Sequence, residues 1–264
     1  MERRTFLGVG AAAAAGAALP ATGAAAATGA SVRVDTRHVD DPGLGRRIPL
    51  NRERAYEVMD ALGLDGLVAG YTHNVYYLTN TVTTLTRFRA EFASFATFPR
   101  DPQQPSFLIS SVGNTWETAN GEREVPEIIA MSGALDWQDY VDASPARMRI
   151  EPKSAGTVAR GQAVKASGPF TDRELAWKRA QETYLPASAP TPAWALQRAL
   201  QRSGLLKGRL AVDDMRIAWL LQGIGVDTAT VVPGDNVFRR IRVVKTPQEI
   251  AFLLAAQVFT QHAA

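Results

Sequence analysis

Residues 63–80 read GLDGLVAGYTHNVYYLTN and contain two short apolar runs separated by a polar turn. The runs DGLVAGY (65–71) and VYYLTN (75–80) are rich in residues that favour extended backbone, so both are predicted to be strands. A helix is predicted just before them, because Asn51 can cap its start and Gly63 can end it. A helix that leads directly into strands is typical of an α/β domain.

Strands and helices continue to alternate along the chain. The stretch RFRAEFASFATFP (87–99) has small or apolar residues at every second position, which predicts a strand with one buried face. Arg89, Glu91 and Thr97 are predicted on the exposed face, where Phe95 is an exception. The side chains predicted to face the core are Phe88, Ala90, Phe92, Ser94, Ala96 and Phe98. Further strands are predicted at 105–112, 125–131, 209–214 and 228–234, and further helices at 171–184, 191–202 and 216–222. The expected fold class is therefore α/β, with a mixed β-sheet flanked by helices.

Composition excludes several classes of function. The chain has 264 residues, 46% of them hydrophobic, which suffices for one large domain or two small ones. The formal net charge is +3 and no run of basic residues is present, so a nucleic-acid partner is not expected. Cysteine is absent, which excludes disulfides, thiolate metal ligands and a thiol nucleophile.

The N-terminus has the pattern of an export signal. Residues 1–30 carry Arg3 and Arg4, then a stretch of mostly Ala and Gly, then small residues suited to a signal peptidase. RRTFL resembles the twin-arginine signal, which implies a periplasmic or extracellular location. A membrane anchor is the weaker interpretation, because Ala and Gly are weakly apolar and Pro20 interrupts the run. No membrane span is expected in the mature chain, and residues 31–47 are predicted to be an exposed lead-in.

Three stretches resemble one known family in order and spacing. They are GLDGLVAGYTHNVYYLTN, GRLAVDDM (208–215) and IRVVKTPQEIAFLLAAQ (241–257). Together they resemble the N-terminal domain of the creatinase/Xaa-Pro aminopeptidase family, peptidase family M24. The resemblance implies that residues 48–243 are this α/β domain. It also implies that residues 244–264 are a linker and the first helix of a catalytic domain.

The resemblance places the family's chemistry outside this chain. The family's pita-bread catalytic domain holds two metal ions with two Asp separated by ten residues, a His and two Glu. Here no two Asp have that spacing, and the histidines are only His38, His73 and His262. A divalent pair (Mn, Co or Zn) is thus expected only in a full-length protein, with no metal, cofactor or catalytic residue in this chain. The last helix is interpreted as part of a truncated catalytic domain; alternatively, its apolar stripe packs back on the domain or on a second copy.

Candidate site residues come from the same resemblance. It implies that an aromatic residue and an arginine among Arg87, Phe88 and Arg89 reach the neighbouring subunit's active site and bind substrate, the arginine through a carboxylate. The alternative is that Phe88 belongs to the core and both arginines lie in solvent. Asn74 is expected to make a turn, with Tyr76 or Leu78 filling core. The adjacent pair Asp213 and Asp214 suits a turn or a helix cap, and the exposed loop residue His73 is given no role.

Two functions follow from these observations. The first is the N-terminal domain of an exported metallohydrolase that cleaves a peptide bond next to proline, or a small amide. The domain would supply subunit contacts in a homo-oligomer and part of the substrate cleft, and would be inactive alone. The alternative is a stand-alone, non-catalytic α/β module that binds a partner chain or a small ligand.

Overall fold

A computed structural model describes residues 50–81, 88, 94–114, 125, 127–131, 149–151 and 168–263. Its helices are α1 (Arg52–Leu62), α2 (Thr72–Thr79), α7 (Asp172–Tyr184), α8 (Pro192–Arg202), α9 (Arg216–Gly223), α10 (Asp235–Val243) and α11 (Pro247–Ala263). Its strands are β1 (Gly66–Ala69), β2 (Ser94–Pro99), β3 (Phe107–Ser111), β4 (Glu127–Met131), β5 (Arg209–Val212) and β6 (Thr230–Pro233). The predicted leader and lead-in lie outside the described residues.

The strands form one mixed six-stranded sheet in the order β4-β3-β2-β1-β5-β6. β2 is antiparallel to both of its neighbours, whereas the pairs β1–β5, β5–β6 and β3–β4 are parallel. In the register, Leu67 of β1 lies opposite Phe98 of β2 on one side and Ala211 of β5 on the other. The fold class is therefore α/β with a mixed sheet, as predicted.

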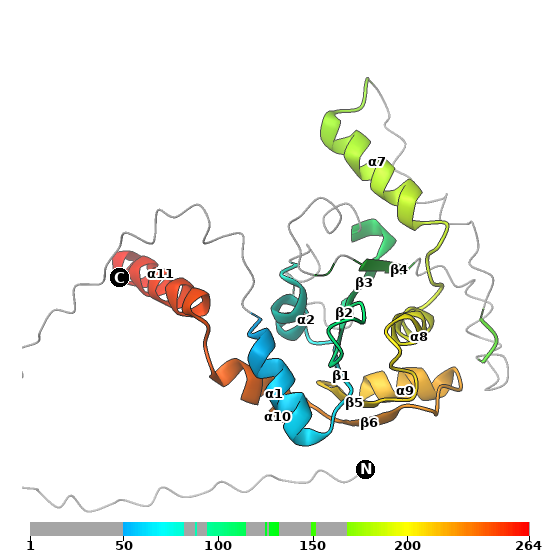
Figure 1. Ribbon diagram of the computed structural model, residues 1–264. Coiled ribbons are helices and arrows are strands. Elements are labelled where there is room, and N and C mark those ends of the chain that lie inside the picture. Colours follow the sequence, from blue (N-terminus) through cyan, green and yellow to red (C-terminus); the bar gives the residue numbers. More distant parts are fainter. Residues whose placement is uncertain are drawn as a thin grey trace, which may run out of the picture. The chain divides into compact units, whose positions relative to one another are not determined.

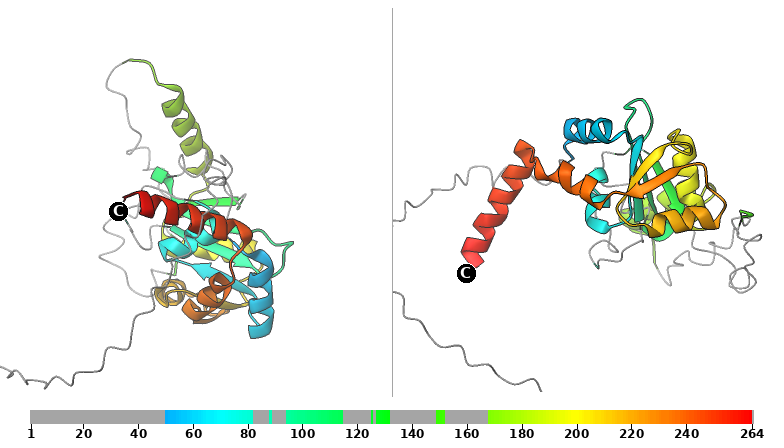
Figure 2. Two further views of the ribbon diagram at one scale, coloured as in Figure 1. Left: turned by 90° about the vertical axis from the view of Figure 1, so that its left-hand side faces the viewer. Right: turned by 90° about the horizontal axis from the view of Figure 1, so that it is seen from below.

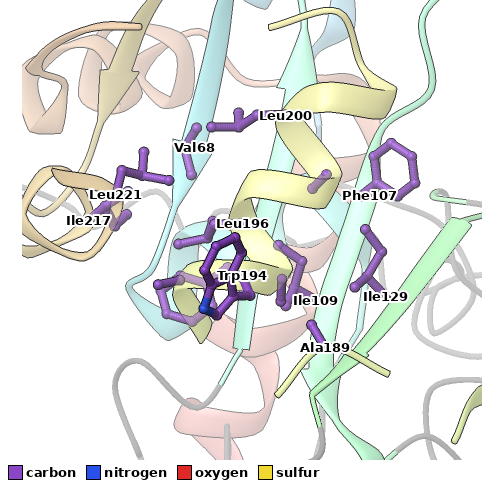
Figure 3. Packing of buried hydrophobic residues seen from close by; sticks show 14 of the residues in the cluster. Val68, Phe107, Ile109, Ile129, Ala189, Trp194, Leu196, Leu200, Ile217 and Leu221 are labelled. Carbon is purple, nitrogen blue, oxygen red and sulfur yellow. The ribbon is translucent and has the colours of Figure 1, made fainter. Parts of the chain in front are cut away.

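Helices cover both faces of the sheet, which gives two separate hydrophobic cores (Figures 1 and 2). α1, α2 and α10 cover one face, on which Leu67, Phe98 and Leu108 point outward from the sheet. α8 and α9 cover the other face, where Trp194 and Leu196 of α8 lie against the strands (Figure 3). Residues of the interior strands alternate between the two cores, so these strands are covered on both faces, whereas the edge strand β6 has no buried residue.

The predicted one-sided burial of β2 is wrong, because this strand is interior to the sheet and covered on both faces. All its residues are buried, including the polar Thr97, which was expected to be exposed, and Phe95, the exception on the same face. The Thr97 hydroxyl accepts a hydrogen bond from the Phe107 amide at 3.2 Å, so its polar atom is not left unsatisfied. Phe88 precedes the strand and is 77% exposed, which contradicts its predicted place in the core.

The second strand predicted at 75–80 is also wrong, because residues 72–79 form α2. The helix ends at Asn80, whose φ of 55° lies in the left-handed region. Tyr77 and Leu78 are buried by it, so Leu78 fills core as expected but Tyr77 does so in place of Tyr76. The β-forming preferences of Val and Tyr are weak compared with the packing that these side chains gain when they face the core from a helix.

Most helix boundaries agree with their capping signals. The Asn51 side chain accepts a hydrogen bond from the Arg54 amide at the start of α1, and Gly63 ends it with φ of 59°. Thr171 and Glu174 form a capping box at the start of α7, and Thr246 and Glu249 form another at the start of α11. The remaining predicted strands and helices are present with boundaries that differ by a few residues.

Helix α10 has no counterpart among the predicted elements. Its buried residues Val237, Phe238 and Ile241 lie on one face and join the core that contains α1. The chain enters α10 at Gly234, where a Cβ atom would lie 2.8 Å from the Val212 nitrogen. Glycine therefore allows the chain to cross closely over the end of β5.

Candidate functional site

The two strands at the centre of the candidate site are β1 and β5, which meet where the chain reverses its direction across the sheet. From β1 the chain passes to β2, β3 and β4 on one side, and it then returns to β5 on the other side. Because β1 and β5 are parallel, their carboxyl ends lie at the same edge. In open α/β sheets this switch point is the usual place for a functional crevice.

A buried carboxylate joins the two strand ends. Asp213 follows β5 directly and is only 6% exposed. Its Oδ1 accepts a hydrogen bond from the Gly70 amide at 2.8 Å, and its Oδ2 accepts from the Tyr71 amide at 3.0 Å. The Asn74 side-chain amide also donates to Oδ2, at 2.9 Å. We call these four residues, Gly70, Tyr71, Asn74 and Asp213, the Asp213 clasp.

The clasp explains why α2 begins where it does. Asp213 binds two backbone amides of the segment between β1 and α2, and the side chain of Asn74 in the helix's first turn. Tyr71, at the N-cap position, has no side-chain capping bond of its own. A carboxylate near the backbone amides at a helix start is also favoured by the helix dipole. Asp213 thus does from 142 residues away what a local capping residue would otherwise do.

Burial and hydrogen bonding act in opposite directions on Asp213. Removal of the carboxylate from water raises its pKa, and this effect is the largest. The hydrogen bonds from Asn74, Gly70 and Tyr71 lower the pKa, and the nearby Asp214 charge raises it. The net result is a pKa above the ordinary value. Burial therefore makes the ionised form of Asp213 less favourable in the folded protein than in water.

A polar rim of Tyr71, His73, Asp214 and Arg216 surrounds the clasp. The Arg216 Nη2 contacts Asp214 Oδ2 at 2.7 Å, and its backbone amide donates to Asp214 Oδ1 at 2.8 Å. The hydrogen bonds from Arg216 are the main reason that the pKa of Asp214 is lowered. The Tyr71 hydroxyl hydrogen-bonds Asp214, which raises the tyrosine pKa, and its ring stacks on His73 with centroids 5.8 Å apart. Asp214 makes the predicted turn before α9.

The clasp retains one buried acceptor that the described residues do not satisfy. The side-chain oxygen of Asn74, a residue with no exposed surface, has no hydrogen-bond partner in the part of the chain that the structure describes. Such atoms are uncommon in folded proteins, since an unsatisfied buried polar group costs about 1–3 kcal/mol.

The arrangement is suited to positioning backbone rather than to catalysis. The Asp213 oxygens are held by three N–H donors, and Asp214 is paired with Arg216, so neither carboxylate is set up as a general base. Across the described residues, no group of three or more His, Asp or Glu side chains is placed to hold a metal ion. The family's metal pair therefore does not fit these residues. That the chain binds no cofactor stays a prediction.

The predicted substrate-binding residues are only partly described. Phe88 is 77% exposed, so the alternative that placed it in the core is wrong. Arg87 and Arg89 lie outside the described residues, and their roles stay predictions. His73 is exposed, as expected.

The contact between Asp213 and Asn74 was missed from the sequence, although each residue closely follows a β-strand. Parallel neighbouring strands end at one sheet edge, so polar residues after two such strands are the signal that could have found it. The misassigned strand at 75–80 hid this signal, because it placed Asn74 in a loop rather than on a helix.

Comparison with models of known protein families gave no match, and no curated protein matched the chain. The fold and the site therefore rest on their own geometry. Among the helices of the described ranges, none is both long and apolar enough to cross a membrane.

Proposed function

We propose that this chain is the N-terminal domain of an exported creatinase/Xaa-Pro aminopeptidase-like metallohydrolase, supplying subunit contacts and part of the substrate cleft. The observation that carries the proposal is the Asp213 clasp. It joins the first and second stretches of the resemblance, GLDGLVAGYTHNVYYLTN and GRLAVDDM, through three hydrogen bonds. Two motifs that are distant in sequence thus contact each other in the structure. If either motif resembled the family only by chance, there would be no reason for the two to meet.

Exposed apolar side chains support a role in contacts. Ile250, Leu253 and Leu254 of α11 are 47%, 57% and 42% exposed. Glu249 is the one charged residue in this 17-residue helix. A helix that is apolar around most of its surface is normally buried in a larger assembly. In the proposal, α11 contacts a catalytic domain or a second subunit.

The exposure of Phe88 supports a role in the substrate cleft. An aromatic ring that is 77% exposed contributes nothing to this domain's own core. Exposed aromatics next to arginines are typical of binding surfaces, because both residue types provide strong contacts. In the proposal, Phe88 packs against substrate in a neighbouring active site, and Arg87 or Arg89 binds its carboxylate.

The decisive experiment uses the native protein recovered from the exported fraction of its source cells. We expect release of the N-terminal residue from an Xaa-Pro peptide, dependent on added divalent metal, by a species heavier than the 28.5 kDa of these residues. The 264-residue chain alone should be inactive. Arg89→Ala should raise KM with little change in kcat, because it removes substrate binding.

Three outcomes would contradict the proposal. Hydrolysis by the 264-residue chain alone would place the reaction among residues that lack the family's ligands. A native mass slightly below 28.5 kDa, with no hydrolysis, would favour the stand-alone binding module. An unchanged KM for Arg87→Ala, Phe88→Ala and Arg89→Ala would remove this segment from the cleft.

A further inference from the structure

A cavity lies at the edge of the sheet opposite to the Asp213 clasp. It is lined by residues that precede β1 and β5, such as Asp65 and Gly208, and by Pro99 at the end of antiparallel β2. Gly66 is paired with Pro99 and Leu210, so these segments meet at this edge. The cavity volume is about 650 Å³, which lies within the range of small-molecule sites.

Hydrogen bonds fix the walls of this cavity without any ligand. The Asp65 amide donates to the Arg209 carbonyl, and the Asp65 carbonyl accepts from the Arg100 amide, each at 2.8 Å. Its Oδ2 accepts from the Arg209 amide at 2.8 Å, and its Oδ1 contacts Arg100 at 3.2 Å. The turn that approaches β5 includes Gly204, with φ of 70°. A site with walls fixed in this way loses little entropy on binding.

Close backbone packing keeps the floor of the cavity rigid. A Cβ atom on Gly66 would lie 2.8 Å from Leu205 Cδ1, and one on Gly208 would lie 3.0 Å from Asp65 Cβ. Leu205 is 4% exposed and lines the cavity beside Tyr56 and two prolines. The apolar part of the lining is therefore a well-packed surface against which a short aliphatic group can rest.

The charged groups of the cavity divide into a paired set and an unpaired set. Arg100 is balanced by Asp60 at 3.1 Å and by Asp65 at 3.2 Å. Asp101 and Lys207 also line the cavity, and neither forms an ion pair with any other described residue. One carboxylate and one ammonium thus remain available to a ligand in the same cavity.

We infer that this cavity binds a small zwitterion, a free amino acid or a dipeptide with an aliphatic side chain. The ligand's ammonium group pairs with Asp101, its carboxylate pairs with Lys207, and its side chain lies on Leu205 and Tyr56. Each exposed ion pair alone contributes little. A single ligand that forms both pairs at once orders only one molecule, so the two contributions combine.

This inference does not depend on the proposed hydrolase function, because binding is measured directly on this chain. The probe is L-leucine, titrated while the amide signals of Gly66, Gly204 and Gly208 are followed by NMR. We expect saturable shifts with a dissociation constant on the order of 1 mM or below. N-acetyl-L-leucine lacks the ammonium and L-leucinamide lacks the carboxylate, and each should bind about tenfold more weakly.

Substitutions separate the two pairs. Lys207→Gln should weaken leucine about tenfold but leave leucinamide unchanged, because leucinamide has no carboxylate to lose. Asp101→Asn should weaken leucine but leave N-acetyl-leucine unchanged, and it keeps the oxygen that accepts from the Gln103 amide. Lys178→Gln on α7, an exposed lysine paired with Glu182, is the matched control and should change nothing.

Two results would overturn the inference. One is the absence of saturable shifts at these three glycines with leucine. The other is equal binding of leucine and both blocked analogues, which would show that the charges of Asp101 and Lys207 do not select the ligand. Neither result depends on hydrolase activity. The titration can therefore fail while the proposed function holds, or succeed while the proposed function fails.

Discussion

Replacing Asp213 by alanine removes the acceptor that holds the ends of β1 and β5 together. The Gly70 amide and the Asn74 side-chain amide then lose their partner in a buried place, whereas the Tyr71 amide is only part-buried. Two unsatisfied buried donors cost about 2–6 kcal/mol. Because burial of the carboxylate is itself unfavourable, part of this cost is recovered, and we expect a net loss of about 2–4 kcal/mol of unfolding free energy.

The assay is urea unfolding of the 264-residue chain, followed by far-ultraviolet circular dichroism. Asp235→Asn is the control, since it removes a carboxylate whose side chain is 46% exposed and paired with Arg239 at 2.9 Å. An exposed pair of this kind is worth about 0–1 kcal/mol. If Asp213→Ala costs no more than this control, the three hydrogen bonds do not hold the strand ends and the reasoning fails.

Three further predictions concern pH, close packing and export. The pKa of folded Asp213 lies above its ordinary value of 3.8, so its ionisation favours unfolding: the stability it contributes is complete below 3.8 and is lost as pH rises through the folded pKa. Asp213→Asn should remove this part of the pH dependence in urea titrations across the acid range, and an unchanged slope would argue against it. Gly234→Ala should cost about 1–3 kcal/mol in the same urea assay, because the new Cβ would lie 2.8 Å from the Val212 nitrogen, a backbone atom that cannot turn away; full retention of stability would show that the crossing can widen. Replacing Arg3 and Arg4 with lysine should leave the protein in the cytoplasmic fraction on immunoblots, and unchanged export would exclude the twin-arginine route.

Local signals in the sequence predicted what depends on neighbouring residues. Asn51, Thr171 and Thr246 each cap the helix that follows them, because a cap needs only a side chain and an amide a few residues away. Gly63 ended α1 as predicted for the same reason. The fold class followed because alternating helices and strands leave few ways to bury both kinds of element.

Features that depend on distant residues were predicted poorly. The alternating pattern around β2 suggested one exposed face, but the helices that cover both faces come from other parts of the chain. Helix α2 was taken for a strand, since nothing in its own eight residues shows that Asp213 binds the turn before it. Phe88 matched the period of a strand by coincidence and lies in solvent. In the first two cases a tertiary contact outweighed the local pattern.

The neighbouring positions of β1 and β5 also determine when the domain can be completed during synthesis. Gly70 leaves the ribosome 143 residues before Asp213 does, an interval of about 7–30 s at ordinary rates of translation. Throughout this time one edge of β1 has no strand beside it, and α1 lacks the apolar cover that Phe238 later provides. An unpaired strand edge is prone to join other chains. Until β5 has been made, this edge of β1 is therefore open to pairing with other chains.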